Sequence, residues 1–311
     1  MPATDANGPI RYLALETGGT KLVAGLAGPD GVLLETRVLR RGASDQAADS
    51  LARLVDVSRG LLGGARPQAV GFGYGGGVHR ARRQPLECFH ESGWDAVDPV
   101  RTLEEAFQAP VYMENDCKVA ALAEAVLGAG QGARTVLYLT LGTGVGGGLV
   151  RDGRIVELSD HGEAEIGHLQ VEPDGPPCPC GRQGCLEALC SGPGLAGLAR
   201  EAGLADPTGP ALMEAWRNGD SAATRQVERA ADGLAAALGA AMTLLAPQAI
   251  VIGGGVGAAN PDFIRLASER AKHRFSSYFQ SFFKVVPAAL GEAVVTQGAA
   301  LLAARGNLVS T

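Results

Sequence analysis

The sequence lacks the features that would bring it to nucleic acid or into a membrane. It has no long run of lysine or arginine, and its formal net charge is −6, so it attracts polyanions weakly. We expect no secretory signal at the N-terminus. The longest uncharged stretch, 241–259, contains Pro247 and a glycine cluster, which indicate a helix end followed by a buried strand rather than a membrane span. We therefore expect a cytoplasmic protein that binds neither nucleic acid nor membranes.

Cysteine is too scarce for a disulfide scaffold, with six residues in a chain of 311, but half of it is clustered. His168 is followed by Cys178, Cys180 and Cys185 in a segment rich in proline and glycine. One imidazole and three thiolates are a ligand set typical of tetrahedral Zn²⁺. Because these four ligands fill the coordination shell, the sequence predicts a structural zinc rather than a hydrolytic one. The alternative is that the cysteines are free and buried.

Positive charge is dense at only one place in the sequence. Arg80, Arg82 and Arg83 lie within four consecutive positions. Arginine side chains are mostly exposed in folded proteins. We therefore expect these three to lie on a solvated turn.

Glycine, in contrast, is abundant, and part of it belongs to an internal repeat. Residues 12–18 (YLALETG) and 138–144 (YLTLGTG) are identical at five of seven positions, 126 residues apart. Each copy reads as an apolar strand that runs into a glycine turn, followed by two further strands joined by an Asp-Gly pair. Helical segments alternate with these strands, so the sequence predicts an α/β fold with mixed sheets.

The repeat also predicts the domain organisation. We expect two lobes, one for each copy, with a cleft between them. The smaller lobe comprises residues 1–116 and 295–311. The larger lobe comprises residues 117–294 and includes the zinc-bound segment 165–190.

The two repeated turns are candidate phosphate sites. Glycine turns leave backbone N–H groups free to bind phosphate oxygens, and threonine and lysine side chains add donors. A third glycine cluster follows an apolar strand, where α/β folds commonly bind ligands. The residues that we assign to a nucleotide are Gly18, Gly19, Thr20, Lys21, Gly142, Thr143, Gly144, Gly254 and Gly255.

Other interpretations of these turns fit less well. The Walker pattern is absent, so the chain is not a P-loop protein. Residues 142–147 match Gly-x-Gly-x-x-Gly, but a strand rather than a helix is expected next, which argues against a dinucleotide site and an NAD-dependent enzyme. The remaining alternative is a pair of hairpin turns that bind nothing.

Taken in order, these motifs resemble the ROK family of bacterial sugar kinases and sugar-responsive repressors. The most specific match is the segment 165–187, which begins Glu-Ile-Gly-His and contains the clustered cysteines. Residues 18–21 and 141–148 resemble the two phosphate turns of the family, and residues 114–124 resemble its active-site segment. The matches cover nearly the whole chain.

The resemblance implies an actin/hexokinase-like, two-lobe fold of the ribonuclease H-like class. It also implies ATP with Mg²⁺ as the phosphoryl donor, a sugar as the acceptor, and a homodimer. In this resemblance Asp116 looks like the catalytic base, and Gly77 lies in a loop that borders the sugar. The residues that look like sugar ligands are Asn115, Glu165, His168 and Glu187.

Elementary chemistry supports the role of Asp116. A sugar hydroxyl is a poor nucleophile, and a carboxylate within hydrogen-bonding reach can orient it and accept its proton. Asp116 is expected where a strand ends and a helix begins, so the alternative is that Asp116 or Asn115 is only a helix cap.

Departures from the family pattern affect the substrate. The family commonly has Asp where this chain has Glu16, and some fructokinases resemble this chain at that position. Glu16 is a candidate Mg²⁺ ligand. The loop 75–79 lacks the usual Pro and Asp. We expect phosphorylation of the 6-hydroxyl of glucose. The alternatives are a fructokinase, an N-acetylhexosamine or N-acetylmannosamine kinase, and, in a different class, a sugar-sensing regulator without catalysis. Such regulators carry an N-terminal DNA-binding domain, for which we expect no room before Gly18.

Overall fold

The chain folds into two units, each containing one copy of the repeat. The computed structural model describes residues 11–42, 45–86, 88, 91–160 and 162–306. Unit 1 is formed by residues 1–126, 153–163 and 292–311. Unit 2 is formed by residues 127–152 and 164–291.

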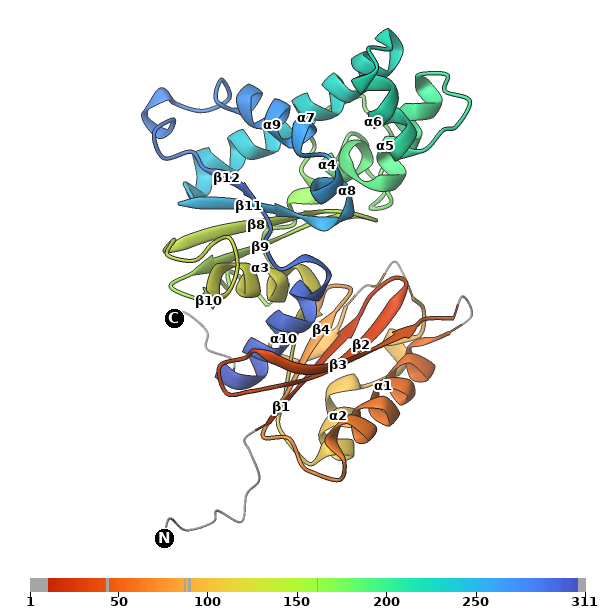
Figure 1. Ribbon diagram of the computed structural model, residues 1–311, viewed down its shortest axis with the longest axis vertical. Helices are drawn as coiled ribbons and strands as arrows, with labels where there is room; N and C mark the ends of the chain where they lie inside the picture. Colours follow the sequence, from red (N-terminus) through yellow and green to blue (C-terminus); the bar gives the residue numbers. More distant parts are fainter. Residues whose placement is uncertain (1–10, 43–44, 87, 89–90, 161, 307–311) are drawn as a thin grey trace. The chain divides into compact units, whose positions relative to one another are not determined.

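The first copy of the repeat begins the mixed sheet of unit 1 (Figure 1). Strand β1 (Tyr12–Thr17) pairs antiparallel with β2 (Lys21–Ala27), which pairs antiparallel with β3 (Leu33–Arg40). On its other side β1 pairs in parallel with β4 (Val70–Tyr74), which pairs in parallel with β7 (Val111–Asn115). The strand order is therefore β3-β2-β1-β4-β7.

Alternation along β1 gives this sheet two different faces, because successive side chains of a strand point to opposite sides. Leu13 and Leu15 join an apolar core with α1 (Ala47–Leu62) and α2 (Pro99–Phe107). Ala14 joins a second, smaller core with α10 (Val294–Arg305) on the opposite face (Figure 1). The small side chains on this face let α10 approach the sheet closely.

Glycines make the closest of these approaches. Helix α10 packs against β1, β4 and α3 (Asp116–Val126). A Cβ on Gly71 of β4 would lie 1.9 Å from the carbonyl oxygen of Ala299, and one on Gly298 would lie 1.9 Å from that of Val119. Residues larger than glycine have no room at either position. The other elements of unit 1 are the strands β5 (Val78–His79), β6 (Gln84–Pro85) and β10 (Arg154–Ile155) and the 3₁₀ helices η1 (Trp94–Ala96) and, at the unit boundary, η4 (Gly291–Ala293).

The second copy of the repeat builds the sheet of unit 2 in the same way. Strand β8 (Thr135–Leu141) pairs antiparallel with β9 (Val145–Arg151) and in parallel with β11 (Ala249–Gly253), which pairs in parallel with β12 (Val285–Pro287). The predicted repeat of sequence is thus a repeat of topology, and the predicted mixed α/β class is confirmed.

Helices account for most of the rest of unit 2. The longest is α7 (Ser221–Leu245), whose first turn is capped by the carboxylate of Asp220. Helix α7 packs against the other long helices of this unit. In the described part of the chain, no helix combines the length and apolar character needed to cross a membrane. The other elements are η2 (Ile166–His168), α4 (Leu186–Cys190), α5 (Gly192–Glu201), α6 (Gly209–Arg217), α8 (Gly254–Ala259), α9 (Pro261–Ala271) and η3 (Ser277–Phe279).

The unit boundaries differ from the predicted lobes at three places, since residues 117–126, 153–163 and 292–294 belong to unit 1. Helix α3 belongs to unit 1, although the prediction ended that lobe at residue 116, because α3 packs tightly on α10. Residues 153–163 also return to unit 1.

We predict that Gly298→Ala destabilises the protein, because the added methyl group meets the backbone of Val119, which cannot move without displacing α3. Overpacking of this kind costs about 1–3 kcal/mol. Urea unfolding measures the loss.

The matched control is Gly60→Ala in α1, where a Cβ meets nothing within 4 Å. This variant should gain up to ~1 kcal/mol from helix propensity. Equal stability of the two variants would contradict the close packing of α10 on α3.

Candidate active site and metal centre

Helix α3 begins directly where β7 ends, and Asn115 and Asp116 form this junction. The side-chain oxygen of Asn115 accepts hydrogen bonds from the backbone N–H groups of Cys117 (3.0 Å) and Lys118 (3.2 Å). Asn115 therefore caps the helix. Its amide nitrogen donates to Asp116 Oδ1 (3.1 Å) and to the carbonyl oxygen of Gly76 (3.0 Å).

These bonds hold the Asp116 carboxylate in one orientation. Asp116 Oδ1 accepts from Asn115 Nδ2 and from the N–H of Cys117 (2.7 Å). A Cβ on Gly75 would lie 3.8 Å from both Asp116 Oδ2 and the Cα of Gly18. Within unit 1, the predicted base thus lies beside the first glycine turn, with Gly75 next to both.

The first turn carries an ion pair between the buried Glu16 and the partly exposed Lys21. Gly18 N–H donates to the carbonyl oxygen of Lys21 (3.0 Å), which closes the turn. Lys21 Nζ lies 3.3 Å from Glu16 Oε1 and donates to the carbonyl oxygen of Glu292 (3.1 Å). The other Glu16 oxygen accepts from the hydroxyl of Thr296. Glu16 therefore already has partners for both oxygens, and direct Mg²⁺ ligation would compete with them.

The second turn lies in unit 2, next to the third glycine cluster. Gly142 N–H donates to the carbonyl oxygen of Gly144 (2.9 Å). A Cβ on Gly142 would come within 4.0 Å of the backbone nitrogen of Gly255, and Gly254 has a φ of 79°. The candidate nucleotide residues of unit 2 are therefore neighbours. The antiparallel strand β9 follows the turn, as predicted, so no dinucleotide-type helix starts there.

Glu187 has a role that the sequence did not predict. Its Oε2 accepts a hydrogen bond from the backbone N–H of Val145 (2.9 Å), at the end of the second turn. A Cβ on Gly144 would lie 2.7 Å from the same oxygen. Because Glu187 stands two residues after Cys185, in α4, the cysteine segment supports the second glycine turn through this carboxylate.

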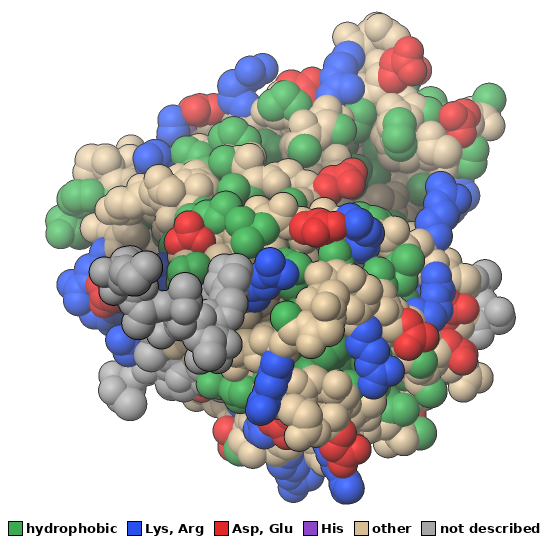
Figure 2. All heavy atoms as spheres, turned by 60° about the horizontal axis from the view of Figure 1, so that its bottom comes forward, with side chains coloured by type: hydrophobic (Ala, Val, Ile, Leu, Met, Phe, Trp, Pro, Cys, Tyr) green, Lys and Arg blue, Asp and Glu red, His purple; other side chains and the backbone are tan. Residues whose placement is uncertain are grey.

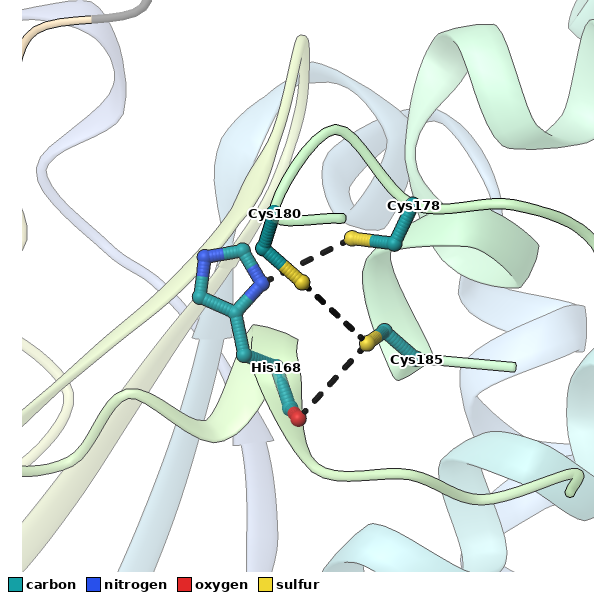
Figure 3. A group of neighbouring side chains, drawn as sticks. All are labelled: His168, Cys178, Cys180 and Cys185. Atoms are coloured by element: carbon teal, nitrogen blue, oxygen red, sulfur yellow. Dashed lines mark hydrogen bonds between the residues drawn. The ribbon is translucent and has the colours of Figure 1, made fainter. Parts of the chain in front are cut away.

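The four predicted zinc ligands converge (Figure 3). Ligand atoms of His168, Cys178, Cys180 and Cys185 all lie within 4.8 Å of one another. Cys178 Sγ lies 3.7 Å from His168 Nδ1, and Cys180 Sγ lies 3.7 Å from Cys185 Sγ. Ligands about 3.8 Å apart are expected around a tetrahedral zinc with Zn–S bonds of about 2.3 Å. The geometry therefore fits the metal. The second ring nitrogen of His168 points away from the sulfur atoms (Figure 3).

The thiols of this cluster differ in acidity. Burial raises the pKa of Cys178 to about 12. For Cys180, hydrogen bonds from Arg182 and from the neighbouring thiols outweigh burial and lower the pKa to about 6. If all three sulfurs were thiolates at these distances they would repel one another, and a divalent cation would offset that repulsion.

Arg80 corrects the prediction of a solvated arginine turn. Its side chain is only 7% exposed, whereas Arg82 is exposed and Arg83 is half exposed. Arg80 donates from both terminal nitrogens to Glu163 (2.7 and 2.8 Å) and from Nε to Glu114 Oε2 (2.7 Å). Burial alone would lower the pKa of Arg80, but these bonds outweigh it and raise the pKa. Its partners lie 34 and 83 residues away in sequence, so no local pattern reveals them.

The remaining predicted residues lie close to these features. The carbonyl oxygen of Gly77 accepts from the N–H of Leu86 (2.7 Å), which closes the hairpin formed by β5 and β6. The carbonyl oxygen of Glu165 accepts from the N–H of His168 (3.0 Å) in η2. Unit 1 therefore brings together Asp116, Asn115, Gly77 and the first turn. Unit 2 brings together the second turn, Gly254, Gly255, Glu187 and the cysteine cluster.

Comparison with characterised proteins shows sugar kinases over nearly the whole chain. A glucokinase of Thermotoga maritima is 29% identical over 305 residues, covering 94% of this chain and 96% of the relative. A kanosamine kinase of Amycolatopsis mediterranei is 34% identical over 295 residues, covering 94% and 95%. An N-acetylmannosamine kinase of Escherichia fergusonii is 33% identical over 250 residues, covering 79% and 84%.

Solved structures agree with this result. A ROK hexokinase from Thermus thermophilus superposes with a TM-score of 0.84 at 32% identity, covering 94% of this chain and 98% of that one. A ROK family glucokinase from Streptomyces griseus, in complex with glucose and AMPPNP, superposes with a TM-score of 0.75 at 29% identity, covering 95% and 100%. The predicted fold class is that of these enzymes.

The profile of the ROK family matches residues 12–306. With sugar kinases as its relatives and structural neighbours, the chain belongs to the ROK family and is a sugar kinase, a phosphotransferase.

Proposed function

We propose that this sugar kinase transfers the γ-phosphoryl group of ATP to the 6-hydroxyl of glucose, with Asp116 as the catalytic base. The observation that carries the proposal is the β7–α3 junction, where Asn115 and the N–H of Cys117 hold the Asp116 carboxylate beside the first glycine turn. A carboxylate fixed in this way is suited to orient an alcohol and to accept its proton.

In the proposed reaction, the sugar oxygen forms a bond to the γ-phosphorus while the bond from that phosphorus to the oxygen of ADP breaks. The hydroxyl proton goes to Asp116. The backbone N–H groups of the two glycine turns, together with Lys21, stabilise the phosphate charge. Mg²⁺ bound to ATP neutralises further charge. Because both oxygens of Glu16 are engaged, we propose that Glu16 acts on the ion through water.

We propose that Asn115, Glu165, His168, Glu187 and Gly77 bind the sugar. With Nδ1 of His168 on the metal, its other ring nitrogen faces away from the cluster (Figure 3) and is available to a sugar hydroxyl. Metal ligation fixes the orientation of such a ring. The zinc in this proposal is structural, since three sulfurs and one nitrogen complete its shell.

Glucose is supported by the Streptomyces griseus relative, whose structure contains glucose and AMPPNP. The kanosamine and N-acetylmannosamine kinases among the relatives support amino sugars as the second candidate.

We propose further that the enzyme is a cytoplasmic homodimer, as the family resemblance implies. Acidic and basic side chains are interspersed among the described residues on the face drawn in Figure 2, which gives no support to a partner of strongly charged surface such as nucleic acid.

We predict that Asp116→Asn lowers kcat by about 10²- to 10⁴-fold, the usual contribution of a general base, while the KM for glucose changes little. A coupled assay of ADP release measures both constants. Asp56→Asn on the exposed face of α1 is the control and should behave as wild type. Wild-type turnover by Asp116→Asn would remove this residue as the base.

The zinc content of the purified enzyme tests the metal site. We expect about one zinc ion per chain by atomic absorption, and loss of that zinc in Cys180→Ser, together with a lower melting temperature. Sugar kcat/KM should fall by about 10- to 100-fold, because the ligands orient Glu187 and His168.

Cys190→Ala serves as the control for the metal, since Cys190 is fully buried but lies outside the cluster, with Sγ directed to the carbonyl oxygen of Ala230. It should keep its zinc. A Cys180→Ser enzyme with full zinc content would refute the assignment of the ligands.

The acceptor is tested with a panel of sugars in the same ADP assay. We expect the highest kcat/KM with glucose, compared with fructose, N-acetylglucosamine, N-acetylmannosamine and kanosamine. A higher value with an amino sugar would replace glucose by that class. Absence of turnover with every sugar, while glucose still binds, would favour a sugar-sensing protein.

A further inference from the structure

A buried network of charged side chains surrounds Arg80 in unit 1, and the proposed reaction does not use it. Two cations, Arg80 and Lys118, face three carboxylates, Glu114, Glu157 and Glu163. The side chains of all but Glu157 are at most 7% exposed. Buried ion pairs of this kind are weak evidence of stability, since apolar groups of similar size often stabilise as well. The network therefore calls for another explanation.

One arm of the network ends at the proposed base. Glu114 Oε2 accepts from Arg80 Nε, and Glu114 Oε1 accepts from the backbone N–H of Asn115 (2.8 Å). Asn115 in turn orients Asp116. The guanidinium group is thus linked to the carboxylate of Asp116 through Glu114 and Asn115, which is held by its backbone N–H and orients Asp116 with its side-chain amide.

The other arm ends where the chain leaves unit 1. Arg80 holds Glu163 with two parallel hydrogen bonds and also donates to the carbonyl oxygen of Ser159 (3.0 Å). Glu163 is the last residue of unit 1 before the chain continues to Glu165 and His168. Between them, Ala164 has a φ of 58°, a left-handed conformation that is strained in residues other than glycine and that persists only where the surroundings impose it.

We propose that Arg80 is a positioning residue, whose fork fixes both the Asn115–Asp116 junction and the start of the segment that carries Glu165 and His168. A guanidinium group suits this task because its planar fork binds one carboxylate with two nitrogens and a second carboxylate with the third. Lysine has a single charged nitrogen and cannot reproduce this geometry. The proposal rests on the proposed roles of Asp116 and Glu165.

The test compares Arg80→Lys with Arg82→Lys, an exposed arginine of the same turn, in full-length enzyme. For Arg80→Lys we expect kcat/KM for the sugar to fall by about 10- to 100-fold, the usual cost of a displaced catalytic group. The sugar KM should rise, and the ATP KM should stay within about twofold, because no nucleotide turn is touched. Arg82→Lys should match wild type.

Two results would overturn the proposal. One is an Arg80→Lys enzyme with wild-type constants for the sugar. The other is a loss that comes only from a smaller folded fraction, with unchanged kcat and KM per folded molecule, as a purely structural role requires. If Arg80→Lys does not fold, Glu163→Gln decides. A raised sugar KM in that variant supports the positioning role, and wild-type constants refute it.

The same assays keep this proposal separate from the proposed function. Wild-type turnover of a hexose and its loss in Asp116→Asn test the function alone. When both hold, unchanged constants in the Arg80 variants refute only the positioning role.

Discussion

The start of α3 places the strictest demand on unit 1, because the helix follows β7 with no residue between them. The first N–H groups of a helix need partners outside the helix, and the side chain of Asn115 supplies one for Cys117 and Lys118. The N–H of Asn115 is bound by Glu114, and Glu114 is bound by Arg80. The orientation of the Asp116 carboxylate thus follows from the satisfaction of backbone groups around it.

In unit 2, a side chain also binds a backbone N–H group of the candidate site, but this side chain comes from a later helix. The glycine turn of this unit is short of side chains, and the carboxylate of Glu187 binds the turn at Val145 from outside. Glu187 can do so because Cys185 and His168 hold its segment within one compact cluster. A segment rich in proline and glycine has little apolar surface to bury, and its four converging side chains fit a metal ion that would order it.

Local sequence patterns predicted much of the structure, but they did not predict contacts between residues that are far apart in the sequence. The strands that flank each turn, the α/β class and the convergence of Cys178, Cys180 and Cys185 followed from alternation and spacing along short segments. The burial of Arg80 did not, because its acceptors are distant in the sequence and each looks like an ordinary surface carboxylate. The bond from Val145 to Glu187 was hidden for the same reason.

The topological repeat has one consequence for how its two halves have diverged. In the structure, β1 ends at Thr17 and β2 begins at Lys21, just as β8 ends at Leu141 and β9 begins at Val145. The positions of the Glu16–Lys21 ion pair are therefore taken in unit 2 by the uncharged residues Thr140 and Val145. In unit 1 the charged side chains at the turn belong to the hairpin itself. In unit 2 the only carboxylate described at the turn is that of Glu187, which comes from the later helix α4. The two hairpins therefore share a topology but are not interchangeable. A chimaera with the hairpins exchanged would place Lys21 beside the helix that carries Glu187, and it would leave unit 1 without the Glu16–Lys21 ion pair.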